Sequence, residues 1–235
     1  MGGYLKRLAA PKTWPIQRKE KAWVTKPLPC GHKLDFCMSI SVILNEVLKI
    51  TKTNAEVKKL LANKEIFVDN RRVKDYKEGV GLFDVLSFPQ INKYYTLIIS
   101  EKNKLKLIEI SKEEAQFKPL KIIRKNVIKG GRIQVTCHDG RTILFDKSKV
   151  NDTLIFNLKD KKIVKHLPLT NNSLVYIIKG NHVGKIGKYM GEVRHGLKKF
   201  GVIKFDKQTG EVLIENLFVI DEKIANLIEK GGNEK

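Results

Sequence analysis

Residues 53–72, TNAEVKKLLANKEIFVDNRR, carry the signals that decide the fold. Thr53 and Glu56 have the spacing of a capping box, which predicts the start of a helix, and apolar residues at helical spacing follow. The apolar run at 66–68 predicts a short strand. The polar run at 69–72 predicts a turn, because its asparagine tolerates left-handed backbone. The stretch therefore predicts a helix that leads into a β-hairpin.

A second, earlier helix is predicted just before this stretch. Ser41 is a plausible N-cap, and apolar residues recur at i, i+1, i+4 and i+5 from Ile43. A further strand at 85–88 closes the segment. Two short helices, a hairpin, and cations on the second helix and on the turn are typical of a compact RNA-binding module. Residues 42–92 resemble the S-four RNA-binding domain of ribosomal proteins, some tRNA synthetases and pseudouridine synthases. The cations expected to line its RNA groove are Lys58, Lys59, Lys64, Arg71 and Arg72.

The charge of the chain points to a polyanionic partner. The 235 residues include 46 Lys and Arg against 25 Asp and Glu, a formal net charge of +21. The excess is spread over residues 1–41, 42–75, 93–168 and 169–220 rather than gathered in one tail. Such a distribution indicates several contacts along a nucleic acid and argues against a membrane anchor. No apolar run approaches the ~18 residues that a membrane span needs.

The first 41 residues predict an extended basic arm. They hold four of the seven prolines, and their apolar residues show no helical spacing. Cations alternate with Tyr4, Trp14 and Trp23. Each tryptophan has two open interpretations, stacking on RNA or packing against the next domain. The candidate RNA contacts in this arm are Lys6, Arg7, Lys12, Trp14, Arg18 and Lys19.

The remaining sequence is rich in strands. Residues 93–168 predict a central β-rich domain, in which Asp139-Gly140 is a hairpin signal. Residues 169–220 combine an apolar strand, a loop with three glycines and a returning strand. This pattern resembles the KOW motif of SH3-like β-barrels. Residues 221–235 are net acidic and are expected to form a C-terminal tail. The prediction is thus an α+β multi-domain protein, with weaker RNA contacts at Arg132, Arg141, Lys185 and Arg194.

No catalytic or metal chemistry is supported by the remaining motifs. The loop at Gly180–Lys185 is one residue shorter than a phosphate-binding loop, and it lacks the Ser or Thr that such a loop needs next. Cys137 and His138 are neighbours in a strand, so their side chains point to opposite faces. Cys30, His32 and Cys37 offer only three zinc ligands, where a structural site wants four, and a metal role for them stays open. An odd, sparse set of three cysteines fits a reducing compartment such as the cytoplasm.

Across about residues 1–220, the chain resembles the archaeal and eukaryotic S-four-e family of small-subunit ribosomal proteins. The resemblance is carried by LKRLAAPK-x-W at 5–14, GHKL at 31–34, GLFDV at 81–85, HDGRTI at 138–143, KVNDT at 149–153, Leu174-Val175, Gly180, Gly184, Ile186-Gly187 and FVI at 218–220. Tyr4 replaces the usual His, and Cys30 departs from the family pattern. The acidic tail lacks the basic extension of eukaryotic members, which favours an archaeal form.

The resemblance implies a structural constituent of the small ribosomal subunit in the cytoplasm. Such a protein has no enzymatic activity and no cofactor, and it contacts rRNA and neighbouring ribosomal proteins. Neither a membrane nor a homo-oligomer is expected. The alternative is a free-standing RNA-binding factor for ribosome assembly or recycling. An RNA-modifying enzyme would need a catalytic domain, and the strand-rich residues after position 92 contain no catalytic acid constellation.

Overall fold

The capping box at Thr53 forms in the structure and starts helix α2 (Asn54–Ala62). The Thr53 hydroxyl accepts a hydrogen bond from the Glu56 amide at 3.3 Å, and the Glu56 carboxylate accepts one from the Lys52 amide at 2.9 Å. The hydrogen bond from Lys52 also holds the pKa of Glu56 below its usual value. Val57 and Leu61 are buried, so the apolar face of the helix points into the core.

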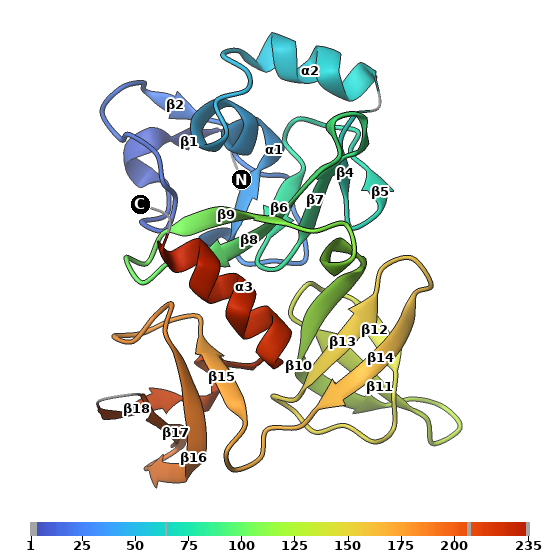
Figure 1. Cartoon of the computed structure of the whole chain (residues 1–235), viewed down its shortest axis with the longest axis vertical. Helices are drawn as coiled ribbons and strands as arrows, with labels where there is room; N and C mark the ends of the chain where they lie inside the picture. The colour runs from blue at the N-terminus through green and yellow to red at the C-terminus, as the bar shows by residue number, and fades with distance from the viewer. Residues whose placement is uncertain (1–3, 64, 206–207, 234–235) are drawn as a thin grey trace. The chain divides into compact units, whose positions relative to one another are not determined.

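The computed structural model describes residues 4–63, 65–205 and 208–233. The chain divides into two units, whose elements are labelled in Figure 1. The first unit is Met1–Ile98 with Lys104–Gln116, and the second is Ile99–Asn103 with Phe117–Lys235. The molecule is rich in strands and has few helices, which agrees with the predicted α+β class.

The first helix begins two residues earlier than predicted. Its N-cap is Ser39, whose hydroxyl accepts from the Val42 amide at 3.4 Å. Ser41 instead lies inside the helix and donates to the side chain of Asn54 at the start of α2. Its hydroxyl therefore joins the two helices instead of capping one. The helical segment comprises α1 (Ile40–Val42) and the π-helical turn η3 (Ile43–Val47).

One antiparallel sheet of the first unit has the strand order β5-β4-β7-β8-β9. Its strands are β4 (Phe67–Val68), β5 (Arg71–Arg72), β7 (Val85–Phe88), β8 (Lys93–Ile99) and β9 (Leu105–Ile110). The turn between β4 and β5 has left-handed backbone at Asp69 and Asn70, with φ of +50° and +60°, as the asparagine predicted. Strands β8 and β9, which lie after the domain boundary expected at residue 92, extend this same sheet.

The N-terminal segment is folded and is not an extended arm. It contains β1 (Leu5–Lys6), η1 (Arg7–Ala9), β2 (Trp23–Val24), η2 (Leu34–Phe36) and β3 (Cys37–Ser39). Strand β1 pairs with β2, and β3 pairs with β6 (Gly79–Gly81). Trp14 is fully buried, and its indole N–H donates to the Leu34 carbonyl at 3.4 Å. Burial of this large ring provides the segment with the core that its proline-rich sequence did not suggest.

Arg7 is the polar link between this segment and the first helix. Only 1% of its surface is exposed. Its guanidinium donates to both carboxylate oxygens of Glu46, at 2.9 and 2.8 Å, and its Nε donates to the Gln17 carbonyl. A two-pronged ion pair of this kind fixes both position and orientation. The N-terminal segment is therefore fastened to η3 by a buried charge.

The second unit contains two five-stranded antiparallel sheets (Figure 1). The first, in the order β12-β11-β10-β13-β14, is built from β10 (Phe117–Val127), β11 (Ile133–Cys137), β12 (Thr142–Leu144), β13 (Thr153–Asn157) and β14 (Lys162–Leu167). The second, in the order β18-β17-β16-β15-β19, is built from β15 (Leu174–Ile177), β16 (Ile186–His195), β17 (Lys198–Lys204), β18 (Thr209–Leu213) and β19 (Leu217–Val219). A short 3₁₀ turn is present in this unit at η6 (Ile214–Asn216), and two others, η4 (Pro89–Ile91) and η5 (Glu114–Gln116), belong to the first unit.

Two turn signals from the sequence are found in this unit. The Asp139-Gly140 turn connects β11 to β12, and Gly140 has a φ of +81°. Gly184, in the loop between β15 and β16, has a φ of +79°, and a Cβ there would lie 2.5 Å from the amide nitrogen of Glu101. Both its conformation and the space around it therefore require glycine.

The predicted C-terminal tail is mostly a helix, α3 (Glu222–Asn233). Ala225 and Ile228 on this helix are buried. The acidic residues of this segment include Glu222 in the first turn, where a negative charge stabilises the helix through its dipole. The tail is thus folded because its apolar residues recur at helical spacing.

Lys121 joins the two sheets of the second unit. It lies on β10 with 4% of its surface exposed. Its ammonium donates to the carbonyls of Leu217 at 2.6 Å, Glu215 at 2.7 Å and Ile214 at 3.3 Å. Burial lowers the pKa of Lys121 to about 7. Three carbonyl acceptors match the three N–H donors of an ammonium group. Residues 117–167 and 174–219 are therefore connected through a buried cation.

Replacing Arg7 with Met should lower the free energy of unfolding by about 3 kcal/mol, because it leaves the Glu46 carboxylate without its buried cation. Urea denaturation measures the change. The matched control is Lys6→Met at the exposed neighbouring position, which should change stability by less than about 0.5 kcal/mol. Equal effects of the two substitutions would contradict the assigned role of Arg7.

Replacing Lys121 with Met should lower the melting temperature by about 6 °C, because the three carbonyl groups lose their donor in a buried place. Thermal unfolding followed by circular dichroism measures this change. Lys129→Met makes the same replacement at an exposed position and serves as the control. An unchanged or higher Tm in the Lys121 variant would contradict this role. It would mean that the free energy needed to bury the amine exceeds the stabilisation from its hydrogen bonds.

Candidate RNA-binding surface

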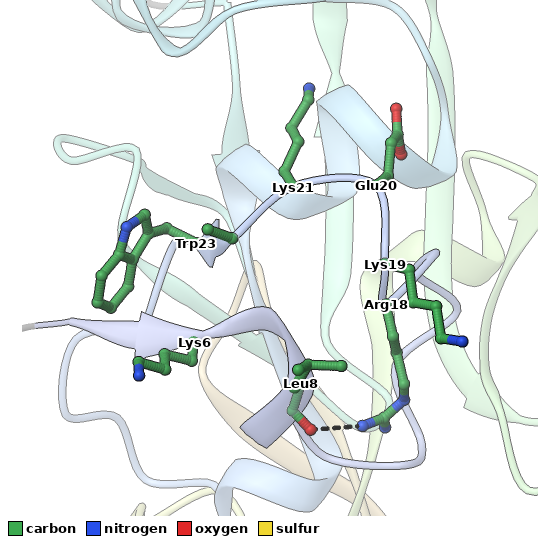
Figure 2. Close-up of a pocket in the computed structure, with 8 residues that line it drawn as sticks. Lys6, Leu8, Arg18, Lys19, Glu20, Lys21 and Trp23 are labelled. Carbon is green, nitrogen blue, oxygen red and sulfur yellow. Dashed lines mark hydrogen bonds between the residues drawn. The ribbon is translucent and has the colours of Figure 1, made fainter.

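The first candidate surface lies around β1 and β2. A pocket of about 470 Å³ is open here (Figure 2), and its lining residues are Lys6, Leu8, Arg18, Lys19, Glu20, Lys21, Ala22 and Trp23. Lys6, Lys19 and Lys21 are exposed to solvent. We call Tyr4, Lys6, Lys19, Lys21 and Trp23 the N-terminal surface.

Two aromatic rings of this surface face solvent. Tyr4 is 84% exposed and Trp23 is 56% exposed. The rings meet edge to face with their centroids 6.1 Å apart. Exposed aromatic rings beside lysines form the kind of platform on which unpaired bases stack. Of the two tryptophans that the sequence left open, Trp23 is therefore the one available to RNA.

Arg7 and Trp14 were both predicted to contact RNA, and the structure corrects this prediction. Both side chains are buried, since folding uses the indole as core and the guanidinium as an ion-pair partner. Trp23, for which the sequence left stacking and packing open, is exposed, although it was not among the candidate contacts. The signal that could have found it is the alternation of Lys21 and Trp23, which places both on one face of an extended chain.

Arg18 is engaged in holding the N-terminal segment together. It is half-buried, and its guanidinium donates to the Leu8 carbonyl at 3.0 Å (dashed in Figure 2) and to the Pro11 carbonyl at 2.9 Å. Lys12, also predicted as a contact, is exposed. The cations of this segment thus separate into exposed lysines and arginines that bond to the protein itself.

The second candidate surface combines α2 with the hairpin of β4 and β5. Lys58 and Lys59 are exposed on the helix, and the Lys58 ammonium lies 5.0 Å from the centre of the Tyr76 ring. The side chain of Arg71 is 77% exposed and pairs with Glu78 at 2.6 Å. Tyr76 and Glu78 belong to one short segment, which contacts both the helix cation and the hairpin cation. We call Lys58, Lys59 and Arg71 the helix–hairpin surface.

Two further residues, Arg72 and Lys64, were predicted for this groove. Arg72 is half-buried, and its guanidinium donates to the Leu61 carbonyl near the end of α2 at 3.4 Å. Since neighbouring strand residues face opposite sides, Arg72 points to the helix while Arg71 points away. Lys64 lies outside the described residues. Arg72 therefore packs the hairpin against the helix.

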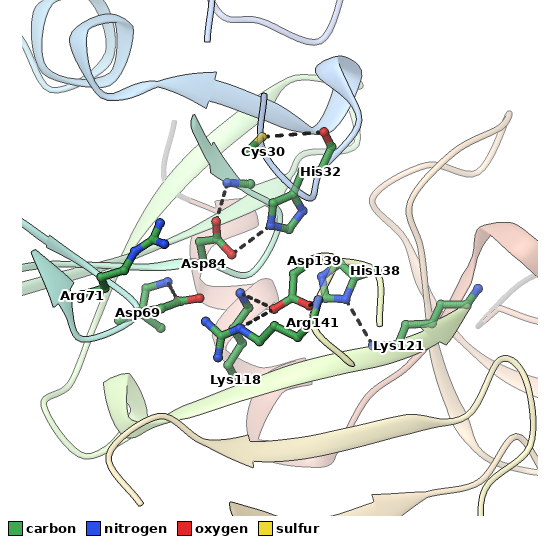
Figure 3. A network of polar contacts seen from close by, with 12 residues as sticks. Cys30, His32, Asp69, Arg71, Asp84, Lys118, Lys121, His138, Asp139 and Arg141 are labelled. Atoms are coloured by element: carbon green, nitrogen blue, oxygen red, sulfur yellow. Dashed lines mark hydrogen bonds and ion pairs between the residues drawn. The ribbon is translucent and has the colours of Figure 1, made fainter. Parts of the chain in front are cut away.

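A buried charge cluster occupies the β11–β12 turn of the second unit. Asp139 pairs with Lys118 at 3.2 Å and with Arg141 at 3.0 Å (Figure 3). Burial opposes ionisation of Asp139, but the adjacent Lys118 charge, with smaller contributions from His138 and Arg141, holds its pKa below the usual value. Arg141 also lies over the Phe156 ring, 5.5 Å from its centre. Its guanidinium is thus occupied by protein contacts.

The other predicted contacts of the second unit are exposed. Arg132 lies beside the turn after β10, and Lys185 lies in the glycine loop before β16. Arg194, near the end of β16, is exposed and pairs with Glu192 at 3.2 Å. These residues are separate in the sequence and come from different strands or loops, so each offers its own point of contact to a polyanion.

The Cys137-His138 pair is structural. Burial raises the pKa of Cys137 to about 12, which keeps it a thiol. The His138 Nδ1 accepts from the Lys121 amide at 3.2 Å, and the His138 and Phe218 rings meet edge to face. Both side chains therefore serve packing and hydrogen bonding.

Potential metal ligands are scattered in the described part of the chain. Over residues 4–63, 65–205 and 208–233, no group of three or more His, Cys, Asp or Glu side chains is placed to hold a metal ion. Within the same described residues, no helix combines the length and apolar character that a membrane crossing requires.

Comparison with known proteins gives consistent results along the chain. Residues 91–163 match the model of ribosomal family S4e, and residues 4–35 match that of the RS4NT (NUC023) domain. The chain is 40% identical to small ribosomal subunit protein eS4 of Nanoarchaeum equitans over 223 residues, which cover 93% of this chain and 95% of the relative. It is 36% identical to the protein of the same name from Methanocella arvoryzae, over 93% of this chain and 94% of the relative.

A solved structure agrees with these relatives. The crystal structure of 30S ribosomal protein S4e from Thermoplasma acidophilum superimposes with a TM-score of 0.68 at 29% identity, covering 80% of this chain and 96% of the other. With relatives matched over nearly their whole length, this chain belongs to ribosomal family S4e.

Proposed function

We propose that this chain binds small-subunit rRNA through the N-terminal surface and the helix–hairpin surface. The observation that carries the proposal is the exposure of the Tyr4 and Trp23 rings among solvent-facing lysines. Lysine and arginine side chains displace the counterions of phosphates, and exposed rings stack on unpaired bases. Lys12, Arg132, Lys185 and Arg194 are exposed cations that extend the same contact to further rRNA segments.

As a member of its family, the chain is a structural, non-enzymatic constituent of the small ribosomal subunit in the cytoplasmic ribosome. Its relatives carry that name, which favours this function over a free-standing assembly or recycling factor. Its role there is to stabilise the folded rRNA. Cations placed between crowded phosphate backbones reduce their repulsion, so the rRNA holds its folded geometry.

The domain identities expected from the sequence are part of the proposal. Two short helices followed by the β4–β5 hairpin support an S-four type RNA-binding domain within residues 42–92. A five-stranded antiparallel sheet with a glycine loop before β16 supports a KOW-type SH3-like barrel within residues 169–220. We further propose that neighbouring ribosomal proteins contact the chain and that it is present as a single copy in each subunit.

Sedimentation of cell lysate in high salt tests the function as a whole. The chain should remain with small subunits in a ratio near one to one after the wash. A protein that moves to the soluble fraction would instead be a transient factor. Uridine-isomerising or methyl-transfer activity on rRNA would contradict a non-enzymatic role.

Replacing Lys58, Lys59 and Arg71 together with Ala should weaken binding to small-subunit rRNA and flatten its salt dependence. The slope of log K against log salt should decrease by about 0.7–0.9 for each phosphate that these cations no longer neutralise. The control replaces the exposed Lys159, Lys161 and Lys162 with Ala, which removes the same net charge elsewhere. Identical slopes in the two triple variants would refute the helix–hairpin surface.

Replacing Trp23 with Ala should weaken rRNA binding by about 1–3 kcal/mol while leaving the salt slope unchanged, because stacking does not release counterions. Phe117→Ala removes another exposed ring, on β10, and should leave affinity near that of the wild type. Titration of labelled rRNA at several salt concentrations separates affinity from slope. A Trp23 variant with wild-type affinity would remove the stacking contact from the proposal.

A further inference from the structure

Two of the three cysteines lie near each other in the first unit, Cys30 in the segment before β3 and Cys37 at the start of β3. Cys30 is exposed, whereas Cys37 is only 2% exposed. Their side chains hydrogen-bond to each other. The Cys30 thiol also contacts the His32 carbonyl oxygen at 3.7 Å (dashed in Figure 3). The pair thus has one sulfur that solvent reaches and one that it does not.

Two glycines of β6 make this contact possible. Strand β6 pairs with β3 so that Cys37 lies opposite Gly81. A Cβ added at Gly79 would lie 2.9 Å from the Cys30 sulfur, and one added at Gly81 would lie 2.1 Å from the His32 ring. The side chains of Cys30 and His32 therefore rest directly on β6, beside the strand that holds Cys37. The pairing of β3 with β6 therefore brings both cysteines beside the same two glycines.

The two thiols have different chemical character. The hydrogen bond from Cys37 lowers the pKa of Cys30 to about 6 against the opposing effect of burial, with smaller lowering contributions from the backbone and the imidazole of His32. The same hydrogen bond, together with burial, raises the pKa of Cys37. The imidazole is itself held in place, since His32 Nε2 lies 3.1 Å from an Asp84 oxygen. Cys30 is the exposed thiol and ionises more readily, whereas Cys37 is buried and stays protonated.

We propose that Cys30 and Cys37 are an oxidisable thiol pair that hydrogen peroxide converts into a disulfide. The Cys30 thiolate attacks a peroxide oxygen, so that an S–O bond forms, the O–O bond breaks, and hydroxide leaves and takes up a proton. Cys37 then gives up its proton and attacks the Cys30 sulfur, so that the S–S bond forms and the S–O bond breaks with release of water. In sum, two thiols are oxidised and one peroxide is reduced to two waters.

The disulfide would fasten the backbone around Cys30 to β3 by a covalent bond. The third cysteine provides an internal comparison. Cys137 is buried on β11, and burial raises its pKa, so it is not expected to react. The proposal does not depend on rRNA binding and can be tested on the free protein.

The experiment treats the reduced, full-length protein with one equivalent of hydrogen peroxide. Free thiols are counted after denaturation, and intact mass and peptide maps are recorded. The wild type should lose two of its three thiols and about 2 Da, with Cys30 joined to Cys37. Cys137→Ala should form the same disulfide. Cys30→Ser, a change at an exposed position, should keep both remaining thiols because Cys37 is buried.

A second variant isolates the first step. In Cys37→Ala, Cys30 should stop at the sulfenic acid, which a 1,3-dicarbonyl reagent traps. If that variant does not fold, the comparison of the wild type with Cys30→Ser still decides the matter. Retention of three thiols by the wild type would overturn the proposal. So would oxidation of Cys30 without a link to Cys37, or a disulfide in Cys30→Ser.

Discussion

The ion pair between Arg7 and Glu46 is the interaction on which the first unit depends. It fastens a proline-rich segment, which has little regular structure of its own, to the first helix. With that segment in place, Trp14 fills the core and Trp23 remains outside beside Tyr4. An unpaired guanidinium could not be buried here, because only a well-oriented partner offsets the free energy lost when a charge leaves water. The ion pair with Glu46 therefore fixes the position of the N-terminal segment against the first helix.

Buried cations recur as connectors in this protein. Lys118 pairs with Asp139 beneath the β11–β12 turn, and Lys121 bonds to three carbonyls around η6. Each lies on β10, and each replaces water around its charge with fixed acceptors from another part of the second unit. The positive charge of the chain thus serves two purposes. A few cations hold the fold together from inside, and the exposed majority remains available to a polyanion.

The sequence predicted local structure well wherever the signal was local. The capping box of α2, the left-handed asparagine in the β4–β5 turn and the Asp139-Gly140 hairpin all depend on a few consecutive residues, and all are present. Predictions that depended on distant partners were less accurate. Strands β8 and β9 were expected in the central domain, and in the structure they extend the sheet of β4, β5 and β7. A strand pattern in the sequence does not show which strand it will pair with. The C-terminal tail was judged by its charge, although its apolar residues form a buried helix face.

By itself, the sequence determined the class of partner and the family. The charge excess, its spread along the chain and the matched motifs are properties of composition and order, and no folding alters them. Only the tertiary structure decided which of those residues can meet RNA. Arg7 and Arg18 look alike in the sequence as members of a basic run, yet one is buried against Glu46 and the other bonds to backbone carbonyls. The physical reason is that exposure is set by contacts between residues far apart in the chain, and these contacts exist only once it has folded.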